Sequence, residues 1–171
     1  MRIRQATVED APALLAIYRP YVEDAVVSFE EVAPTVEEFA ARIKKALAGW
    51  QWLVADSDGV CAGYAYGSLH RERAAYRYAV EVSAYVAPAF RRRGIGHALY
   101  LQLFDDLAER GYCSAYAGIT LPNDASVALH RSVGFEPVGV FRSAGWKFGG
   151  WHDVSWYQRK LRNSPLPSLR T

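Results

Sequence analysis

The stretch Arg91-Arg92-Arg93-Gly94-Ile95-Gly96 follows a strand-like apolar segment at 78–86 and runs directly into a helix-like segment at 97–110. The start of a helix leaves backbone N–H groups unpaired and carries a partial positive charge, and glycines let a ligand approach the backbone closely. Three cations beside such a helix start predict a phosphate-binding turn. A solvated basic turn without a ligand is the alternative interpretation.

The spacing of the glycines excludes two common phosphate-binding motifs. A Walker P-loop requires G-x-x-x-x-G-K-[ST], and no glycine in the chain is followed by that Lys-[ST] pair. The dinucleotide fingerprint G-x-G-x-x-G fails because Leu99 stands where the third glycine belongs. The pattern that remains is R-x-x-G-x-G.

The composition indicates one globular domain. The chain has 171 residues, of which 51% are hydrophobic and 22% are charged, which is enough to bury a sizeable core. We expect the domain to span residues 1–162. The segment 163–171 carries Pro165 and Pro167, and we expect it to form a flexible tail.

Charge and hydropathy argue against two classes of partner. The net charge of +2 is too small to indicate nucleic-acid binding, and the arginine triplet is not part of a longer basic cluster. No apolar run approaches the length of a membrane span, and the first residues do not resemble a signal peptide. We therefore expect a cytoplasmic protein that binds neither nucleic acid nor membrane.

Metal and nucleophile signals are weak. Cys61 and Cys113 each stand alone in an apolar segment, where reduced core cysteines are expected. The four histidines show no metal-binding spacing, and no G-x-S-x-G motif occurs. The sequence predicts neither a metal site nor a serine hydrolase.

Hydrophobic periodicity and turn residues predict seven strands and four helices. The strands are expected at 3–6, 50–55, 60–69, 78–86, 114–120, 136–142 and 152–161, and the helices at 7–22, 35–49, 96–110 and 121–133. A tight turn at 56–59 and a glycine-rich turn at 145–150 join two strand pairs. The order indicates a mixed α/β layer fold.

Glu81 stands in the middle of the strand-like segment 78–86. Strand alternation places it on one face with Ala79, Ser83 and Tyr85. A glutamate among apolar residues lies at an edge, pairs with a cation, or acts as a general base whose pKa burial has raised. The residues alone leave these alternatives open, because structural ion pairs also explain buried acids.

A second polar constellation is N-x-x-S-x-x-L-H, with Asn123, Ser126 and His130. Seven residues, or two helical turns, separate Asn123 from His130, so both project from one side of a short helix. The simplest role for the asparagine is a helix cap, and a lone histidine on a helix is more often a surface or core residue than a catalytic one.

Together, R-x-x-G-x-G after a strand and N-x-x-S-x-x-L-H-x-x-x-G-F about thirty residues later resemble the GCN5-related N-acetyltransferase (GNAT) superfamily. Further segments resemble phosphinothricin and methionine sulfoximine acetyltransferases, and the similarity extends over residues 3–161. They are Ala75-Tyr76, Val80-Glu81, Tyr85-Val86, Leu121-Pro122-Asn123-Asp124 and Gly149-Gly150-Trp151-His152-Asp153-Val154. The resemblance implies an α/β GNAT fold, a single domain whose central mixed β-sheet splays after the fourth strand and is flanked by about four helices. It also implies a homodimer.

The resemblance implies an acetyl-CoA-dependent N-acetyltransferase without a metal, in which the α-amino group of a small amino-acid analogue attacks the thioester directly. It assigns acetyl-CoA binding to Tyr85, Val86, Ala87, Arg91, Arg93, Gly94, Ile95, Gly96, His97, Ala98, Asn123 and Ser126. It assigns acceptor binding to Phe29, Arg71, Arg73, Tyr76, Ser83 and Tyr100, beside His130.

The same resemblance implies chemical roles. Glu81 is expected to take the proton of the acceptor ammonium, and a backbone N–H near Val86 to stabilise the oxyanion. His130 is expected to act as an acid or to contact the substrate. Arg71 and Arg73 are expected to bind an anionic group of the acceptor, with ordinary solvated loop charges as the alternative.

The identity of the acceptor stays open at the level of sequence. The segment 82–84 and Arg71 depart from the pattern of the phosphinothricin-type relatives. Acetylation of a protein N-terminus or another amine is one alternative function, and a non-catalytic acyl-CoA-binding module is another.

Overall fold

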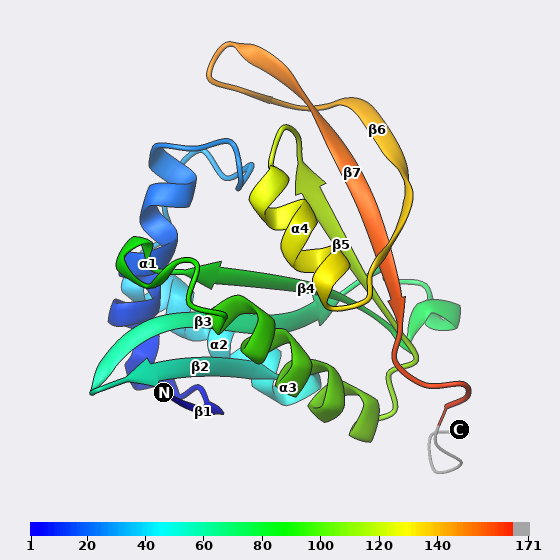
Figure 1. Cartoon of the computed structure of the whole chain (residues 1–171), viewed down its shortest axis with the longest axis horizontal. Helices are drawn as coiled ribbons and strands as arrows, with labels where there is room; N and C mark the ends of the chain where they lie inside the picture. Colours follow the sequence, from blue (N-terminus) through cyan, green and yellow to red (C-terminus); the bar gives the residue numbers. More distant parts are fainter. Residues whose placement is uncertain (166–171) are drawn as a thin grey trace.

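The computed structural model describes residues 1–165. In that part of the chain seven strands form one sheet in the order β1-β2-β3-β4-β5-β7-β6 (Figure 1). The strands are β1 (Arg2–Gln5), β2 (Trp52–Ser57), β3 (Val60–Leu69), β4 (Ala79–Val86), β5 (Ser114–Thr120), β6 (Glu136–Lys147) and β7 (Gly150–Lys160). Neighbouring strands run antiparallel except β4 and β5, which are parallel.

Four α-helices accompany the sheet within residues 1–165: α1 (Ala11–Glu23), α2 (Val36–Gly49), α3 (Ile95–Glu109) and α4 (Asp124–Ser132). The start of α2 follows from its sequence, because Thr35 and Glu38 form the predicted capping box. The first helix starts later than predicted. The segment Val8–Asp10 is a 3-10 turn that precedes α1, since 3-10 turns are frequent at helix ends.

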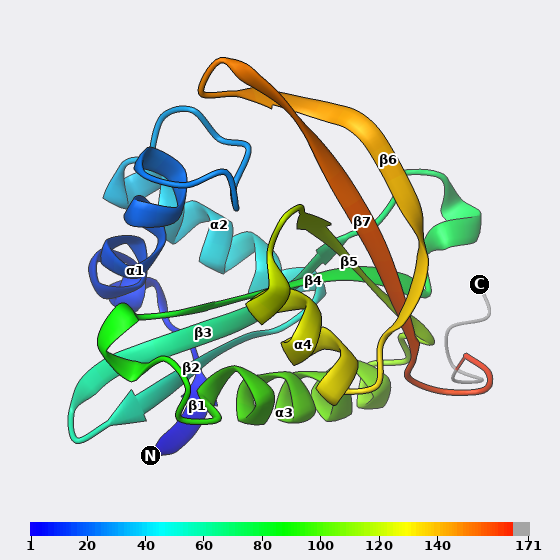
Figure 2. The same cartoon turned by 45° about the horizontal axis from the view of Figure 1, so that its top comes forward.

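The helices build two cores on opposite faces of the sheet. The helices α1 and α2 pack on the face that carries Trp52 and Tyr64, whereas α3 packs on the face that carries Val80 and Val82 (Figure 2). Strand β4 lies between the two cores, so its alternate side chains point to different layers. None of the helices in residues 1–165 is long and apolar enough to cross a membrane.

The sheet opens in the middle. Strands β4 and β5 pair only at the register positions that run from Ala79 with Ser114 to Glu81 with Tyr116. Beyond Glu81, β4 continues along β3 to Val86, whereas β5 continues along β7 to Thr120. The predicted splay after the fourth strand is therefore confirmed, and it starts directly after Glu81.

The hairpin formed by β6 and β7 is longer than predicted, and it extends beyond the rest of the sheet (Figures 1 and 2). The expected turn over 145–150 is wrong. Only Phe148 and Gly149, with φ of 52° and 72°, form the turn, because a two-residue hairpin turn of this kind needs positive φ at both central positions. Gly145 instead ends a bulge in β6.

Candidate active site

The opening between β4 and β5 contains a cavity of about 60 Å³. It brings together predicted site residues from β4, α3 and α4, and residues of β5 and of the α1–α2 loop that were not predicted complete its lining. The lining residues are Val27, Val82, Ser83, Ala84, Tyr85, Tyr100, Gly118, Ile119, Thr120, Asn123, Ser126 and His130. We treat this opening, called the cleft below, as the candidate site.

The backbone of β4 presents a hydrogen-bonding edge to the cleft. The N–H of Ala87 donates to the carbonyl of Ala62 on β3, at 2.9 Å. Because successive residues of a strand turn their N–H groups to opposite edges, the N–H of Val86 faces the opened side, where β5 has already separated. A donor for a ligand in the cleft is thus available at the predicted position.

The arginine-glycine turn leads into α3 where that helix packs near the end of β4 and against α4. Gly94 is the N-cap residue with φ of 75°, a conformation that favours glycine. A Cβ on Gly96 would lie 3.0 Å from Cδ2 of Leu129, so the helix packs closely here. The first helical hydrogen bond runs from the N–H of Ala98 to the carbonyl of Gly94, which leaves the preceding N–H groups for an anion.

The two predicted arginines of this turn rest on aromatic rings. Arg91 donates from Nη2 to the hydroxyl of Tyr21, at 3.1 Å, and its guanidinium lies 5.4 Å from the centre of that ring. The Tyr21 hydroxyl donates in turn to the carbonyl of Val86. Arg93 lies 5.4 Å from the ring of Phe90. Both cations are exposed and are held beside the end of β4.

Asn123 caps α4. Its Oδ1 accepts a hydrogen bond from the N–H of Ser126, at 3.1 Å. The cap engages the carbonyl oxygen of the side chain, so the amide N–H₂ group can still donate to a ligand in the cleft. The structural role and the predicted binding role are therefore compatible.

His130 is buried, with 5% of its surface exposed. Its Nδ1 lies 2.7 Å from the carbonyl of Ser126, so Nδ1 donates and Nε2 carries the lone pair. Nε2 then accepts from the hydroxyl of Tyr100, at 3.0 Å. Burial lowers the pKa of His130, opposed by the hydrogen bond to Ser126. Burial also raises the pKa of Tyr100, so the pair is a neutral imidazole and a protonated phenol.

Glu81 lies at the closed end of the cleft, in the last register pair of β4 and β5. Its side chain is 30% exposed, and Oε1 lies 3.0 Å from Nδ1 of His70. It shares its face of β4 with Ser83, which lines the cleft. The sequence did not indicate His70, because the pairing of Ser68 with Glu81 that brings His70 near the carboxylate is set by the tertiary structure.

Residues 3–156 match the family model described as "Acetyltransferase (GNAT) domain". The chain belongs to the GNAT acetyltransferase family.

Individual relatives agree with this assignment. The GNAT acetyltransferase is 39% identical over 169 residues to phosphinothricin N-acetyltransferase of Streptomyces viridochromogenes, covering 98% of this chain and 92% of that protein. It is 34% identical over 168 residues to L-methionine sulfoximine/L-methionine sulfone acetyltransferase of Salmonella typhimurium, covering 98% of each.

A solved structure gives the same result. The GNAT superfamily phosphinothricin acetyltransferase (Pat) from Sinorhizobium meliloti, in complex with AcCoA, superposes with a TM-score of 0.93 at 35% identity. The match covers 99% of this chain and 95% of that chain. The family, fold and enzyme class predicted from the sequence are confirmed.

In this acetyltransferase the α1–α2 loop forms one side of the cleft through Val27. A buried lysine, Lys147 of β6, holds the loop in place. Its Nζ donates to the carbonyls of Val22, Ala25 and Ser28 at 2.6, 2.8 and 2.7 Å. Burial lowers the pKa of this ammonium, and nearby carboxylates oppose the shift. The sequence reasoning missed this residue.

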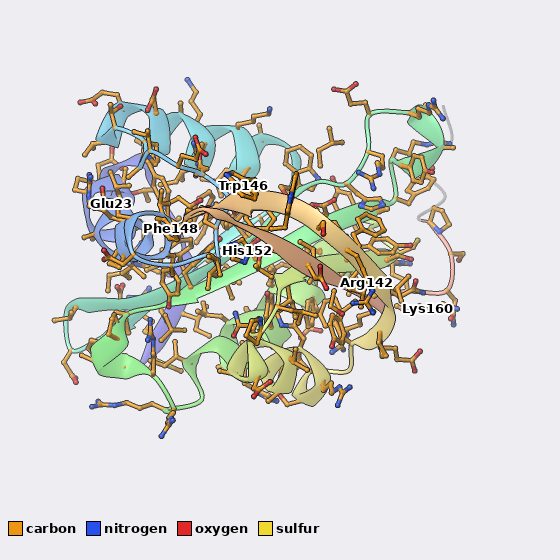
Figure 3. All side chains as sticks on the ribbon, turned by 90° about the horizontal axis from the view of Figure 1, so that it is seen from above. Glu23, Arg142, Trp146, Phe148, His152 and Lys160 are labelled. Atoms are coloured by element: carbon orange, nitrogen blue, oxygen red, sulfur yellow. The ribbon has the colours of Figure 1, made fainter. Side chains whose placement is uncertain are left out.

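The predicted acceptor-binding residues fall into two groups. Ser83 and Tyr100 line the cleft. Phe29 does not line it, and its ring lies 6.3 Å from that of His152 on β7. Figure 3 shows His152 on the hairpin beside Phe148 and Trp146.

Arg71, Arg73 and Tyr76 form the second group. They lie on the exposed segment after β3 and do not line the cleft. Tyr76 makes an edge contact with His70, with ring centres 5.7 Å apart. The structure therefore does not bring the two predicted anion-binding arginines together with Ser83 and Tyr100.

A larger cavity of about 270 Å³ lies between α2 and strands β2 and β3. Half of its lining residues are aromatic, and two buried atoms of these residues, Trp52 Nε1 and Tyr64 Oη, have no hydrogen-bond partner. The walls include none of the predicted donor-binding, acceptor-binding or catalytic residues, whereas six of these residues line the smaller cavity. We therefore place the chemistry in the smaller cleft.

Proposed function

We propose that this protein is an acetyl-CoA-dependent N-acetyltransferase for the α-amino group of a small amino-acid analogue of the phosphinothricin or methionine sulfoximine type. The observation that carries the proposal is the opened edge of β4, which runs from Glu81 to a glycine-capped helix start. The names of the relatives, and the AcCoA in the related structure, support this choice of donor and acceptor.

The donor site fits a phosphorylated, extended ligand. The N–H groups from Gly94 to Ala98 and the cations Arg91 and Arg93 would hold the pyrophosphate. The backbone of Tyr85–Ala87, with Asn123 and Ser126 opposite, would hold the pantetheine arm. Acetyl-CoA supplies an activated acetyl thioester when it is bound.

Glu81 would act on the acceptor. An ammonium group is not a nucleophile, so one proton must leave before the amine attacks, and the Glu81 carboxylate would take it directly or through water. The N–H of Val86 would donate to the negative charge that develops on the carbonyl oxygen.

His130 would contact and orient rather than supply a proton. Its Nδ1 proton is engaged by Ser126, and its Nε2 accepts from Tyr100. The lowered pKa of His130 keeps it neutral at physiological pH. The Tyr100 hydroxyl, aligned by this bond, and Ser83 would shape the acceptor side of the cleft.

A homodimer is part of the proposal. Four aromatic side chains of the β6–β7 hairpin are more than half exposed, namely Phe141, Trp146, Phe148 and Trp151. Exposed aromatic clusters of this kind are typical of protein interfaces. We place the enzyme in the cytoplasm, where acetyl-CoA is available. Arg71 and Arg73 lie outside the cleft, so they would bind only an anionic acceptor group that extends beyond it.

Thiol release from acetyl-CoA tests the proposal when it is measured across free amino acids, their phosphinic and sulfoximine analogues, and short peptides. We expect turnover with one or more free amino-acid analogues and little with peptides. Turnover with peptides alone would favour acetylation of protein N-termini. Tight acetyl-CoA binding without turnover on any amine would favour a non-catalytic module.

A further inference from the structure

We infer that His70 is a positioning residue for Glu81, an inference that rests on the proposed role of Glu81 as the base. The Nδ1 atom of His70 lies 3.0 Å from Oε1 of Glu81. Within residues 1–165 no other side chain hydrogen-bonds to this carboxylate, which leaves Oε2 for the acceptor ammonium or a bridging water.

The His70 ring is fixed by its neighbours. It stacks on Tyr116 of β5 with ring centres 4.4 Å apart and an interplanar angle of 12°. It also makes an edge contact with Tyr76, and its side chain is only 11% exposed. Tyr116 is the register partner of Glu81. The paired residues of β4 and β5 therefore position both groups at the point where the sheet opens. Glu81 carries the carboxylate, and Tyr116 supports the His70 ring that hydrogen-bonds to it.

This geometry has a chemical consequence. A carboxylate on a flexible side chain samples several rotamers, and a fixed N–H donor at one oxygen restricts it to the orientation that presents the other. When the acceptor ammonium loses its proton, the N–H bond breaks, an O–H bond forms at Oε2, and the electron pair stays on nitrogen. His70 keeps its own proton at Nδ1 throughout this step.

Two substitutions separate hydrogen bonding from packing. The variant His70→Phe keeps a flat ring that can stack on Tyr116 but has no donor, whereas His70→Asn restores an N–H donor near the Nδ1 position. For His70→Phe we expect kcat to fall at least about tenfold, as for loss of a hydrogen bond to a charged group. KM for acetyl-CoA should stay within about twofold, because the donor site is untouched. Because His70→Asn restores the donor, its kcat should recover toward the wild-type value.

These measurements distinguish the positioning role of His70 from the role of Glu81 as the base. Wild-type kcat in His70→Phe would overturn the inference, and so would equal losses of kcat in His70→Phe and His70→Asn. Turnover retained by Glu81→Gln would instead reject the base itself. If His70→Phe does not fold, ¹⁵N NMR of labelled histidines in the wild type and in Glu81→Leu tests the hydrogen bond between His70 and Glu81. The His70 ring signals should shift in Glu81→Leu, and unchanged signals would overturn the inference.

Discussion

His130 makes hydrogen bonds through both ring nitrogens, and these bonds leave it a single tautomer. The Ser126 carbonyl accepts a hydrogen bond from the Nδ1–H group, and the Tyr100 hydroxyl donates one to Nε2. Because burial also lowers its pKa, His130 has no spare proton for a departing thiolate at neutral pH. The thiolate would therefore be protonated by solvent or leave as the anion.

The lowered pKa of His130 makes stability depend on pH. The unfolded chain takes up a proton on this histidine near its ordinary pKa of about 6.5, whereas the folded protein resists it. We therefore expect the unfolding free energy to decrease as the pH falls from about 7.5 to about 5.5. This one group contributes at most about 1.4 kcal/mol to the decrease, because a single proton is involved over about one pH unit.

Urea denaturation at both pH values measures this contribution. The matched variant is His130→Asn, which keeps a donor for the Ser126 carbonyl and does not titrate. Its unfolding free energy should depend less on pH than that of the wild type. Identical pH dependence in the two proteins would show that His130 is not held neutral by folding.

Single residues differ in how well the sequence predicts them. Glu81 and Asn123 are found by strand alternation and helix capping, which are local rules. His70 and Lys147 were missed because their contacts depend on tertiary structure. Lys147 donates to a carbonyl 125 residues away, and no local pattern indicates such a partner.

Among the structural elements, the turn before α3 carries the most specific proposal. A Cβ at Gly96 would crowd Leu129 of α4, so the start of α3 would have to shift and its free N–H groups would move with it. We expect Gly96→Ala to raise the Kd for acetyl-CoA about tenfold, or about 1.4 kcal/mol, as measured by isothermal titration calorimetry.

A second glycine provides the control. A Cβ at Gly49, the last residue of α2, would meet no atom within 4 Å. Gly49→Ala should therefore leave the Kd unchanged. If Gly96→Ala also binds acetyl-CoA normally, the turn is only a basic surface segment.

The loop between α1 and α2 is fastened to the hairpin by Lys147. Replacement by methionine would remove the ammonium that donates three hydrogen bonds. The carbonyls of Val22, Ala25 and Ser28 would then lose this donor. We expect Lys147→Met to lower the free energy of unfolding by about 3 kcal/mol, measured in urea. The exposed Lys160 of β7 is the control (Figure 3), and Lys160→Met should change it by less than about 0.5 kcal/mol. Equal effects would contradict the anchoring role.

The elements themselves were largely predictable. Capping residues and periodicity located the helices, and Asp58-Gly59 forms the expected tight turn with φ of 53° and 80°. The β6–β7 turn was placed wrongly because the sequence does not show which of the three glycines from 145 to 150 lies in the turn. Pairing of Trp146 with Trp151 across the hairpin, which sequence does not reveal, decides where the strands end.

At the scale of the whole molecule, we propose that a second copy of the chain binds to the β6–β7 hairpin. Trp146 and Trp151 lie across from one another with ring centres 5.3 Å apart, and both are more than half exposed. We expect sedimentation equilibrium to give twice the chain mass of 19.1 kDa. The double variant Trp146→Glu/Trp151→Glu should sediment as a monomer, because buried unpaired charges oppose association.

Val60 of β3 is also more than half exposed but lies outside this hairpin. Val60→Glu should leave the dimer intact. A wild-type protein that sediments as a monomer would contradict the proposed dimer, and a dimer unaffected by the double variant would move the interface elsewhere.

The splay of the sheet was predictable only through family resemblance. Periodicity identifies β4 and β5 as strands, but nothing local indicates that their ladder ends after Glu81. For the same reason the sequence does not show that Arg71 and Arg73 lie outside the cleft while Ser83 and Tyr100 line it. Long-range arrangement, rather than residue type, determines which predicted residues meet.

The central claim is that the opened strand pair forms an acetyltransferase site in which Glu81 deprotonates the acceptor. Amine-dependent thiol release by Glu81→Gln tests it most directly, with acetyl-CoA binding measured on the same sample. We expect release to fall by at least about 100-fold, within the range for loss of a general base, while the Kd for acetyl-CoA stays unchanged. Near-wild-type release by Glu81→Gln would contradict the claim.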